Sequence, residues 1–173
     1  MIATVNDIKT KGRPVSRHLH DDVILPLIRE SEMKEIRHAL GDALYLDLDA
    51  YVDANRNPVN EAYSNLLDGC TWKMNGEKRI VIGLIEIICY LTQGRLVKAG
   101  DLHITRAGNK LKGNENSETA DIKDRIAFYK DLFITAQEYL KGVVEYIRIN
   151  LENSCKNTAK IYPKSVTIQA IGD

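Results

Sequence analysis

Apolar residues recur every three or four positions over the first part of the chain. Across residues 21–40 this spacing predicts a helix, with Pro26 in its first turns. Gly41 is expected to end that helix, because glycine readily adopts the left-handed backbone conformation common at helix C-termini. Asp42 is the expected N-cap of a second helix, whose apolar face extends to Val52. The pattern therefore predicts two consecutive helices joined by a glycine.

The middle of the chain is polar at first and then strongly apolar. Residues 53–58 are predicted to form a polar loop, and a short third helix is expected over about residues 59–67. The glycine-containing segment 68–78 is interpreted as a loop that Trp72 pins to the body. The run 80–91 is rich in Ile and Val, which suits a strand. Its length and its all-round apolar character favour a buried helix instead.

A short hairpin and a long helix are expected next. Residues 102–112 alternate between apolar and polar around a Gly-Asn pair, which indicates a β-hairpin. From about Thr119 to Leu151 the spacing predicts one long helix. Its apolar stripe comprises Ile122, Ile126, Tyr129, Phe133, Ala136, Leu140, Val143, Ile147 and Leu151. Two partners fit this stripe: the preceding helix, or, for part of its length, a neighbouring subunit.

The two ends differ from the helical body. Residues 1–20 are interpreted as an extended N-terminal arm, because Gly12 and Pro14 interrupt any helix. Residues 156–173 form an extended tail in which the alternation from Ser165 to Ile171 favours a strand. That strand needs a partner, either in this chain's hairpin or in another chain.

The expected fold class is mainly α. It is a small helical bundle of about five helices with a long C-terminal helix, a short β-hairpin and extended N- and C-terminal arms. The arm (1–20), the helical domain (21–155, with the hairpin at about 102–112) and the tail (156–173) are its expected parts. The length of 173 residues fits one domain.

The net charge is zero, but acidic and basic residues lie in different parts of the chain. Lys+Arg and Asp+Glu number 24 each, which argues against a protein held to nucleic acid by bulk basic charge. The acidic residues concentrate in the helices, and the basic ones in the extended segments and the hairpin. Such segregation suits self-assembly, in which basic arms reach acidic bodies of neighbouring copies, although an ordinary solvated surface explains it as well.

The sequence favours a non-enzyme without cofactor or metal. The sequence has no glycine-rich phosphate loop and no nucleophile elbow. The three cysteines are widely spaced, so a disulfide framework is not expected. His18 and His20 beside Asp22, or Glu86 within the apolar run, are the best starting points for a small enzyme. No secretory signal and no membrane-spanning run is evident.

Several short motifs together resemble a known family. They are Asp-Ile-Lys at 7–9, Arg-Pro-Val-Ser at 13–16, Ile-Leu-Pro-Leu-Ile-Arg-Glu-Ser-Glu at 24–32 and Leu-Gly-Asp-Ala-Leu-Tyr at 40–45. With the hairpin and the long last helix, they resemble the head–tail connector (adaptor, or neck-ring) proteins of tailed bacteriophages, in the form found in crAss-like phages. The similarity covers about residues 5–152 and leaves out the tail.

The resemblance implies a structural virion protein made in the host cytoplasm. Its partners would be further copies of itself in a ring, usually a dodecamer, together with the portal protein and adjacent neck or tail ring proteins. Packaged DNA would pass through the lumen without specific binding, and no membrane would be involved. The alternative is a small helical DNA-binding or regulatory module, supported by the basic residues of the arm and hairpin.

The resemblance places the hairpin at ring contacts or the channel, and the terminal segments on neighbouring rings. The candidate interface residues are Arg106, Asn109, Lys110, Lys112, Arg13, Arg17, Tyr162, Val166 and Ile168.

Overall fold

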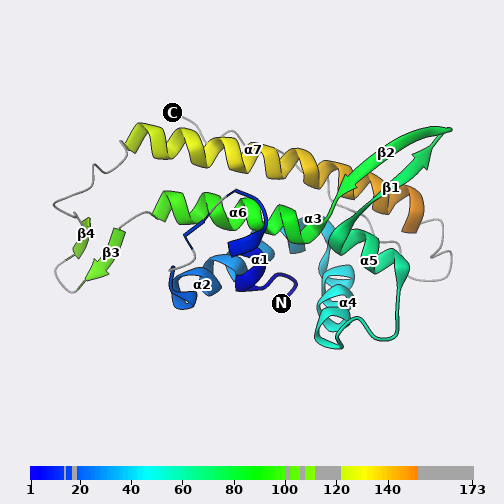
Figure 1. Ribbon diagram of the computed structural model, residues 1–173, viewed down its shortest axis with the longest axis horizontal. Coiled ribbons are helices and arrows are strands. Elements are labelled where there is room, and N and C mark those ends of the chain that lie inside the picture. Colours follow the sequence, from blue (N-terminus) through cyan, green and yellow to red (C-terminus); the bar gives the residue numbers. More distant parts are fainter. Residues whose placement is uncertain (14, 17–18, 100–101, 106–107, 112–121, 152–173) are drawn as a thin grey trace.

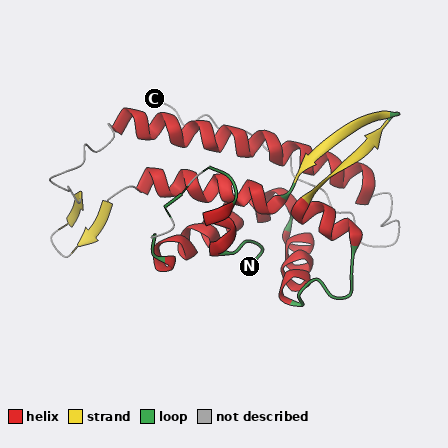
Figure 2. Ribbon diagram, in the orientation of Figure 1, coloured by secondary structure: helices red, strands yellow, loops and turns green. Residues whose placement is uncertain are grey.

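The computed structural model describes residues 1–13, 15–16, 19–99, 102–105, 108–111 and 122–151. The described chain is mainly helical, as the sequence predicts, and ends in the long helix α7 (Ile122–Tyr146) (Figures 1 and 2).

Helix α6 (Leu84–Ala99) is the centre of the core. It packs along α7 on one side and against α2 (Asp21–Ser31) on another (Figure 1). Buried residues occur on nearly every turn, as expected for a helix surrounded by others. The predicted helix at 80–91 is therefore correct from Leu84 onward, but residues 80–82 belong to a strand.

Helix α2 continues through a π-helical turn, η1 (Glu32–Ile36), into α3 (Arg37–Leu40). Gly41 ends this run with a φ of 80°, a conformation that L side chains rarely adopt. Helix α4 (Asp42–Asp53) follows at once.

Asp42 is not the N-cap of α4. Its carboxylate instead accepts two hydrogen bonds from the Arg37 guanidinium, at 2.7 and 3.2 Å. Helix α5 (Glu61–Asp68) does have a side-chain cap, because the Asn60 amide oxygen accepts from the backbone N–H of Tyr63.

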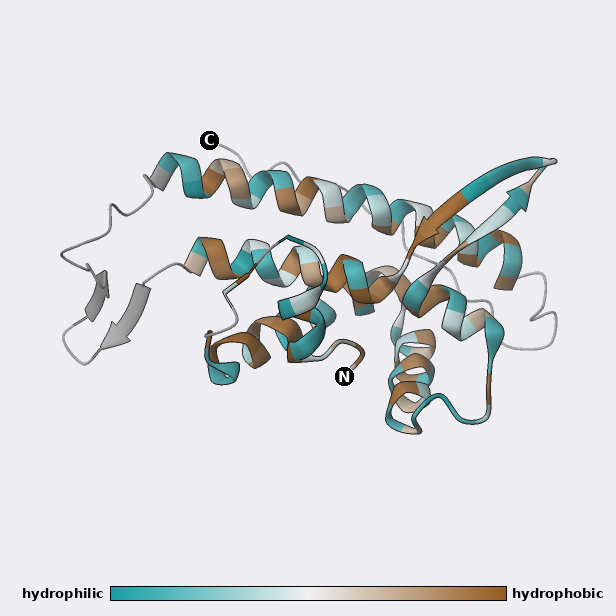
Figure 3. Ribbon diagram, viewed as in Figure 1, coloured by the Kyte–Doolittle hydropathy of each residue, from teal (hydrophilic) through white to brown (hydrophobic). Residues whose placement is uncertain are grey.

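A hairpin follows α5 where the sequence analysis expected a loop. Strands β1 (Gly69–Met74) and β2 (Glu77–Ile82) pair antiparallel, with Cys70 opposite Val81. The turn residues Asn75 and Gly76 both have positive φ, which suits a tight hairpin. Along β2 the residues change from polar near the turn to apolar near α6 (Figure 3). Trp72 does pin this segment, since its ring meets the Tyr146 ring edge-on at 5.5 Å.

The predicted hairpin near 102–112 is confirmed. Strands β3 (Leu102–Thr105) and β4 (Gly108–Leu111) pair antiparallel, with Leu102 opposite Leu111.

The apolar stripe of the long helix is correct only in its C-terminal half. Leu140, Val143 and Ile147 are buried, and α7 ends in a second π-helical turn, η2 (Ile147–Leu151). Ile126, by contrast, is 46% exposed. Tyr129 still lies against Gly94 of α6, and the described residue that is fully buried in the N-terminal half is Leu132, which the predicted stripe leaves out.

The N-terminal residues are not an extended arm. Helix α1 (Val5–Thr10) begins at a capping box in which the Thr4 and Asp7 side chains bond reciprocally to each other's backbone N–H. Ile2 and Ile8 are fully buried against the helices. This segment belongs to the core, because it supplies apolar side chains that cover α2 and α6. The predicted tail, 156–173, lies outside the described residues.

Candidate assembly surfaces

The predicted interface residues divide into three groups. Asn109 and Lys110 lie in β4, opposite Ile104 and His103 of β3. Arg13 lies within the described residues, in the loop after α1. Outside the described residues lie Arg17, Arg106, Lys112, Tyr162, Val166 and Ile168.

Arg13 binds to its own chain. Its guanidinium pairs with the Asp131 carboxylate of α7 and lies over the Phe128 ring, 5.0 Å from the centroid. These contacts combine a charge pair with a cation–π interaction. Arg13 therefore joins the N-terminal segment to α7 within the chain, and its part in an interface stays a prediction.

The loop that carries Arg13 is held by one buried amide. The Gln93 side chain of α6 donates to the carbonyl oxygens of Ile8 (3.1 Å), Lys11 (2.9 Å) and Arg13 (2.9 Å). Its oxygen accepts from the Arg13 backbone N–H at 2.9 Å. With Gln93 only 3% exposed, this amide fixes the chain path after α1.

A buried carboxylate fixes the first residues. Glu32, 1% exposed, accepts from the backbone N–H groups of Ile2 (2.8 Å) and Ala3 (3.0 Å) and from the Tyr45 hydroxyl (2.9 Å). Burial raises the pKa of the Glu32 carboxyl, and these hydrogen bonds oppose the rise. The Met1 ammonium lies nearby, paired with Asp49.

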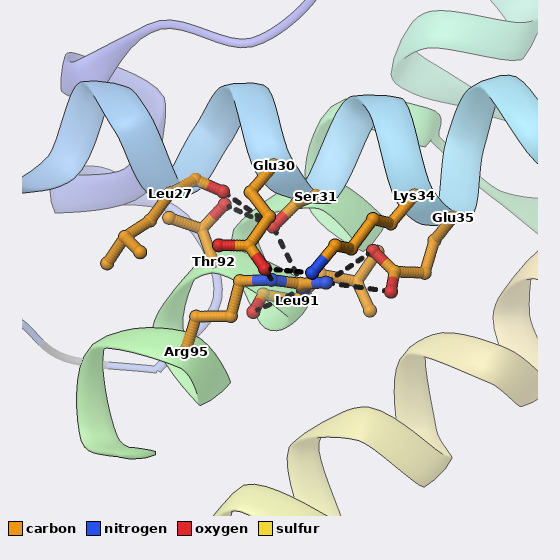
Figure 4. A network of polar contacts seen from close by, with 8 residues as sticks. All are labelled: Leu27, Glu30, Ser31, Lys34, Glu35, Leu91, Thr92 and Arg95. Carbon is orange, nitrogen blue, oxygen red and sulfur yellow. Dashed lines mark hydrogen bonds and ion pairs between the residues drawn. The ribbon is translucent and has the colours of Figure 1, made fainter. Parts of the chain in front are cut away.

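Arg95 of α6 is neutralised inside the bundle. Its Nη2 donates to both carboxylate oxygens of Glu35, at 2.7 and 2.8 Å, and its Nη1 donates to the Ser31 hydroxyl at 3.1 Å (Figure 4). Glu30 lies 3.6 Å from its Nε. Burial raises the pKa of the Glu35 carboxyl, and Arg95 opposes the rise. The cluster ties α6 to α2 and η1, so Arg95 does not reach a neighbouring copy.

The remaining reactive groups do not converge on a catalytic centre within the described residues. Burial raises the pKa of the Cys89 thiol to about 12, so it stays protonated at neutral pH. The Ser31 hydroxyl donates to the Leu27 carbonyl and is not activated by a base. His20 lies at the start of α2 without a side-chain cap bond, and Glu86 is half-buried in the first turn of α6. Among the described residues no group of three or more His, Cys, Asp or Glu could hold a metal ion.

An open groove of about 690 Å³ lies between the loop before α5, α5 itself and the end of α7. Tyr51, Tyr63 and Tyr146 line it with Asn150. The Tyr51 hydroxyl is already bonded to Ser64 at 3.0 Å. The groove offers aromatic and amide groups but no nucleophile, base and orienting group together.

Comparison with known proteins places the chain in a family. Residues 36–162 match the family of unknown function DUF6712. The chain belongs to DUF6712. No curated protein and no solved structure matches it.

The DUF6712 match begins at the end of η1 and covers α3 to α7 and both hairpins. It includes Val59, which is 88% exposed in the loop before α5, and the described helices and strands with the most exposed large aliphatic side chains. These are Ile80 of β2 (75% exposed), Leu46 of α4 (61%) and Ile134 of α7 (58%). Sequence reasoning did not single out these three residues, because periodicity alone does not show which faces remain uncovered. None of the described helices combines the length and apolar character needed to cross a membrane.

Proposed function

We propose that this DUF6712 protein is a structural virion protein, a subunit of the head–tail connector of a tailed phage. In this role it forms a homo-oligomeric neck ring that docks under the portal and continues the DNA channel toward the tail. Adjacent neck or tail ring proteins are its further partners, and the packaged DNA passes without specific binding.

One structural observation supports the proposal: aliphatic side chains are exposed on three separate elements of a body whose internal polar groups are satisfied. Every buried side-chain nitrogen or oxygen of the described residues has a hydrogen-bond partner. Ile80, Leu46 and Ile134 are thus exposed on a chain whose described core has no unsatisfied buried side-chain polar atom. Single exposed apolar residues are common on protein surfaces, so these three support a subunit that neighbours cover together with the family resemblance, and not by themselves.

The motif with the strongest family resemblance also has a structural role. In the Leu-Gly-Asp-Ala-Leu-Tyr segment at 40–45, Leu40, Leu44 and Tyr45 are buried, and Gly41 provides the break between α3 and α4. A shared motif of this kind supports a shared fold, and the assembly role is proposed by analogy with the family that the motif resembles. The net charge of zero suits a channel wall that does not retain DNA.

Electron microscopy of the purified protein, and of particles of the phage that encodes it, tests the proposal. We expect rings with a central opening, and density for this chain below the portal. A protein that stays monomeric and never enters particles would contradict it. A gel-shift assay addresses the DNA-binding alternative, which requires DNA binding that weakens steeply with salt.

A further inference from the structure

We propose that copies of this chain join through one asymmetric contact, in which the outer face of the β1–β2 hairpin of one copy covers the outer face of α4 of the next. The inference rests on the proposed ring and specifies which surfaces build it. Both surfaces lie within described residues.

The first surface, called the hairpin face, consists of Thr71, Lys73, Lys78 and Ile80. The register places Thr71 opposite Ile80 and Lys73 opposite Lys78. Because side chains alternate along a strand, these four lie on the face opposite Trp72, which packs on α7. All four are exposed, so the face is directed away from the chain's own core.

The hairpin face carries an unfavourable charge arrangement. Lys73 and Lys78 are directly opposite each other, at a cross-strand spacing of about 4.5–5.5 Å between Cβ atoms. Like charges in this position destabilise a hairpin. No ion pair links either lysine to any residue in the described part of the chain. An anionic partner would remove this repulsion, which an isolated subunit must tolerate.

The second surface, called the helix face, is the exposed side of α4. Leu46 is its centre, and Ala43 and Ala50 leave space around it. Asp53 is exposed two turns beyond Leu46 on the same side of the helix, and Asp47 is exposed next to Leu46, about 100° around the helix axis. The whole of α4 contains four aspartates and no lysine or arginine.

The Asp47 and Asp53 carboxylates of the helix face have few cations of the described chain near them. Asp53 lies in the last turn of α4, where the helix dipole disfavours a negative charge. Its nearest cation among the described residues is the Met1 ammonium at 3.9 Å, which Asp49 holds more closely. Asp47 has no ion pair with a described residue. A cationic partner would stabilise both carboxylates.

The two faces complement each other. Each has one exposed aliphatic residue, Ile80 or Leu46, accompanied by two charges of a single sign. The outer face of α7 is a weaker match for α4, because Ile134 lies between Lys130 and Glu138, which have opposite charges. The hairpin and α4 project from opposite sides of the molecule (Figure 1). A chain therefore cannot bring its own two faces together. A contact between different surfaces, repeated from copy to copy, builds a ring when the rotation between copies closes and a filament when it does not.

Charge reversal tests this contact. In one variant Lys73 and Lys78 become Glu (K73E/K78E), and in another Asp47 and Asp53 become Lys (D47K/D53K). We expect each variant alone to assemble about a hundredfold more weakly, because like charges then meet at every contact. An equimolar mixture should restore rings, since the reversed hairpin face meets the reversed helix face and the other contacts have the native charges.

Two matched controls isolate the effect. K130E alters an exposed lysine near an exposed isoleucine on α7, and D22K alters an exposed aspartate on α2. Neither should change ring formation, measured by mass photometry and negative-stain electron microscopy at several salt concentrations. The thermal midpoints of all variants should stay close to that of the wild type, because the altered side chains are exposed.

The outcomes separate the inference from the function. Rings that form in both charge-reversed variants, or a mixture that restores nothing, would overturn the proposed contact and leave the connector role intact. Loss of rings in the controls as well would show that assembly follows total charge and not these faces. A wild-type protein that forms no ring in solution or in particles would overturn both proposals.

Discussion

Buried polar side chains at single positions determine the path of the N-terminal segment. Glu32 and Gln93 each bond to several backbone groups of residues 1–13 and leave almost no surface exposed. A buried polar group costs free energy unless its hydrogen bonds are satisfied, so such residues specify one arrangement of the segment around them. Neither role follows from sequence periodicity, because the partners lie up to 85 positions away.

The first prediction concerns the charge of Glu32. Its pKa is raised in the fold, so between the two pKa values the folded protein binds a proton more readily than the unfolded chain does. Stability from this group is therefore lost as pH rises through the raised pKa, and is fully present below the ordinary glutamate pKa. We expect the difference in free energy of unfolding, wild type minus E32Q, to grow as the pH is lowered from 7. Urea unfolding at several pH values measures it.

The exposed E138Q variant serves as the control for this experiment, because its carboxylate is solvated in both states. Its unfolding free energy should run parallel to that of the wild type across the same pH range. If the E32Q and wild-type curves were parallel too, Glu32 would not titrate differently on folding.

The second prediction concerns Gly83, between β2 and α6. A Cβ at this position would lie 2.4 Å from the Leu67 carbonyl oxygen and 2.7 Å from the Gly69 backbone nitrogen. Because backbone cannot yield as a side chain can, G83A should lower the free energy of unfolding by about 1–3 kcal/mol. G142A is the control: its Cβ meets nothing within 4 Å, so it should stabilise α7 by up to about 1 kcal/mol. Equal effects of both variants in thermal unfolding would contradict this interpretation.

At the scale of elements, the two hairpins show what local sequence can predict. The segment 102–112 was predicted correctly from its alternation. The segment 69–82 was interpreted as a loop and a helix start, although Asn75-Gly76 is a strong signal for a tight hairpin turn. Its flanking strands do alternate, with Trp72 toward α7 and Lys73 toward solvent. The apolar Ile80–Ile82 merged with the run that follows and obscured the strand end.

The helices were predicted best where one face is buried. Their existence followed from the apolar spacing, whereas the all-round apolar α6 left strand and helix open, because a fully buried segment has no periodicity to distinguish them. The N-terminal helix was missed despite its Thr4–Asp7 capping box. That helix has only six residues, fewer than two turns, and its stability comes from tertiary burial, which a local pattern does not contain.

The third prediction tests the stripe of α7. Leu140 is 1% exposed at the contact with the core, so L140A should lower the free energy of unfolding by about 2–5 kcal/mol. Phe133 is half-buried, and F133A should cost less than L140A. I134A is the control, since Ile134 is mostly exposed and its truncation should cost near zero in the monomer. Chemical denaturation of the three variants would show whether their order follows burial, as we expect, or the heptad stripe.

For the molecule as a whole, charge segregation along the sequence does not show which charged residues remain unpaired on the surface. Arg13 was assigned to a basic segment that reaches other copies, yet it is bound to Asp131 of its own chain. Arg95 of α6 is likewise bound to Glu35. The candidate contact surfaces instead involve Lys73 and Lys78, on a hairpin that the sequence analysis interpreted as a loop. Long-range pairing decides which charges are neutralised internally, and composition does not contain that information. The sequence therefore predicts that charge is available for assembly, but not where it lies.

The fourth prediction concerns the tail after the bundle. The buried core of the described chain extends to Leu151, which lies before residues 156–173. Deleting 156–173 should therefore leave the thermal midpoint of the monomer unchanged and weaken assembly. A second variant, V166K/I168K, keeps the length but breaks the apolar alternation that favours a strand. If that strand pairs with another copy, both variants should assemble less well to a similar degree. A lower monomer midpoint in the deletion would instead show that the tail covers its own core.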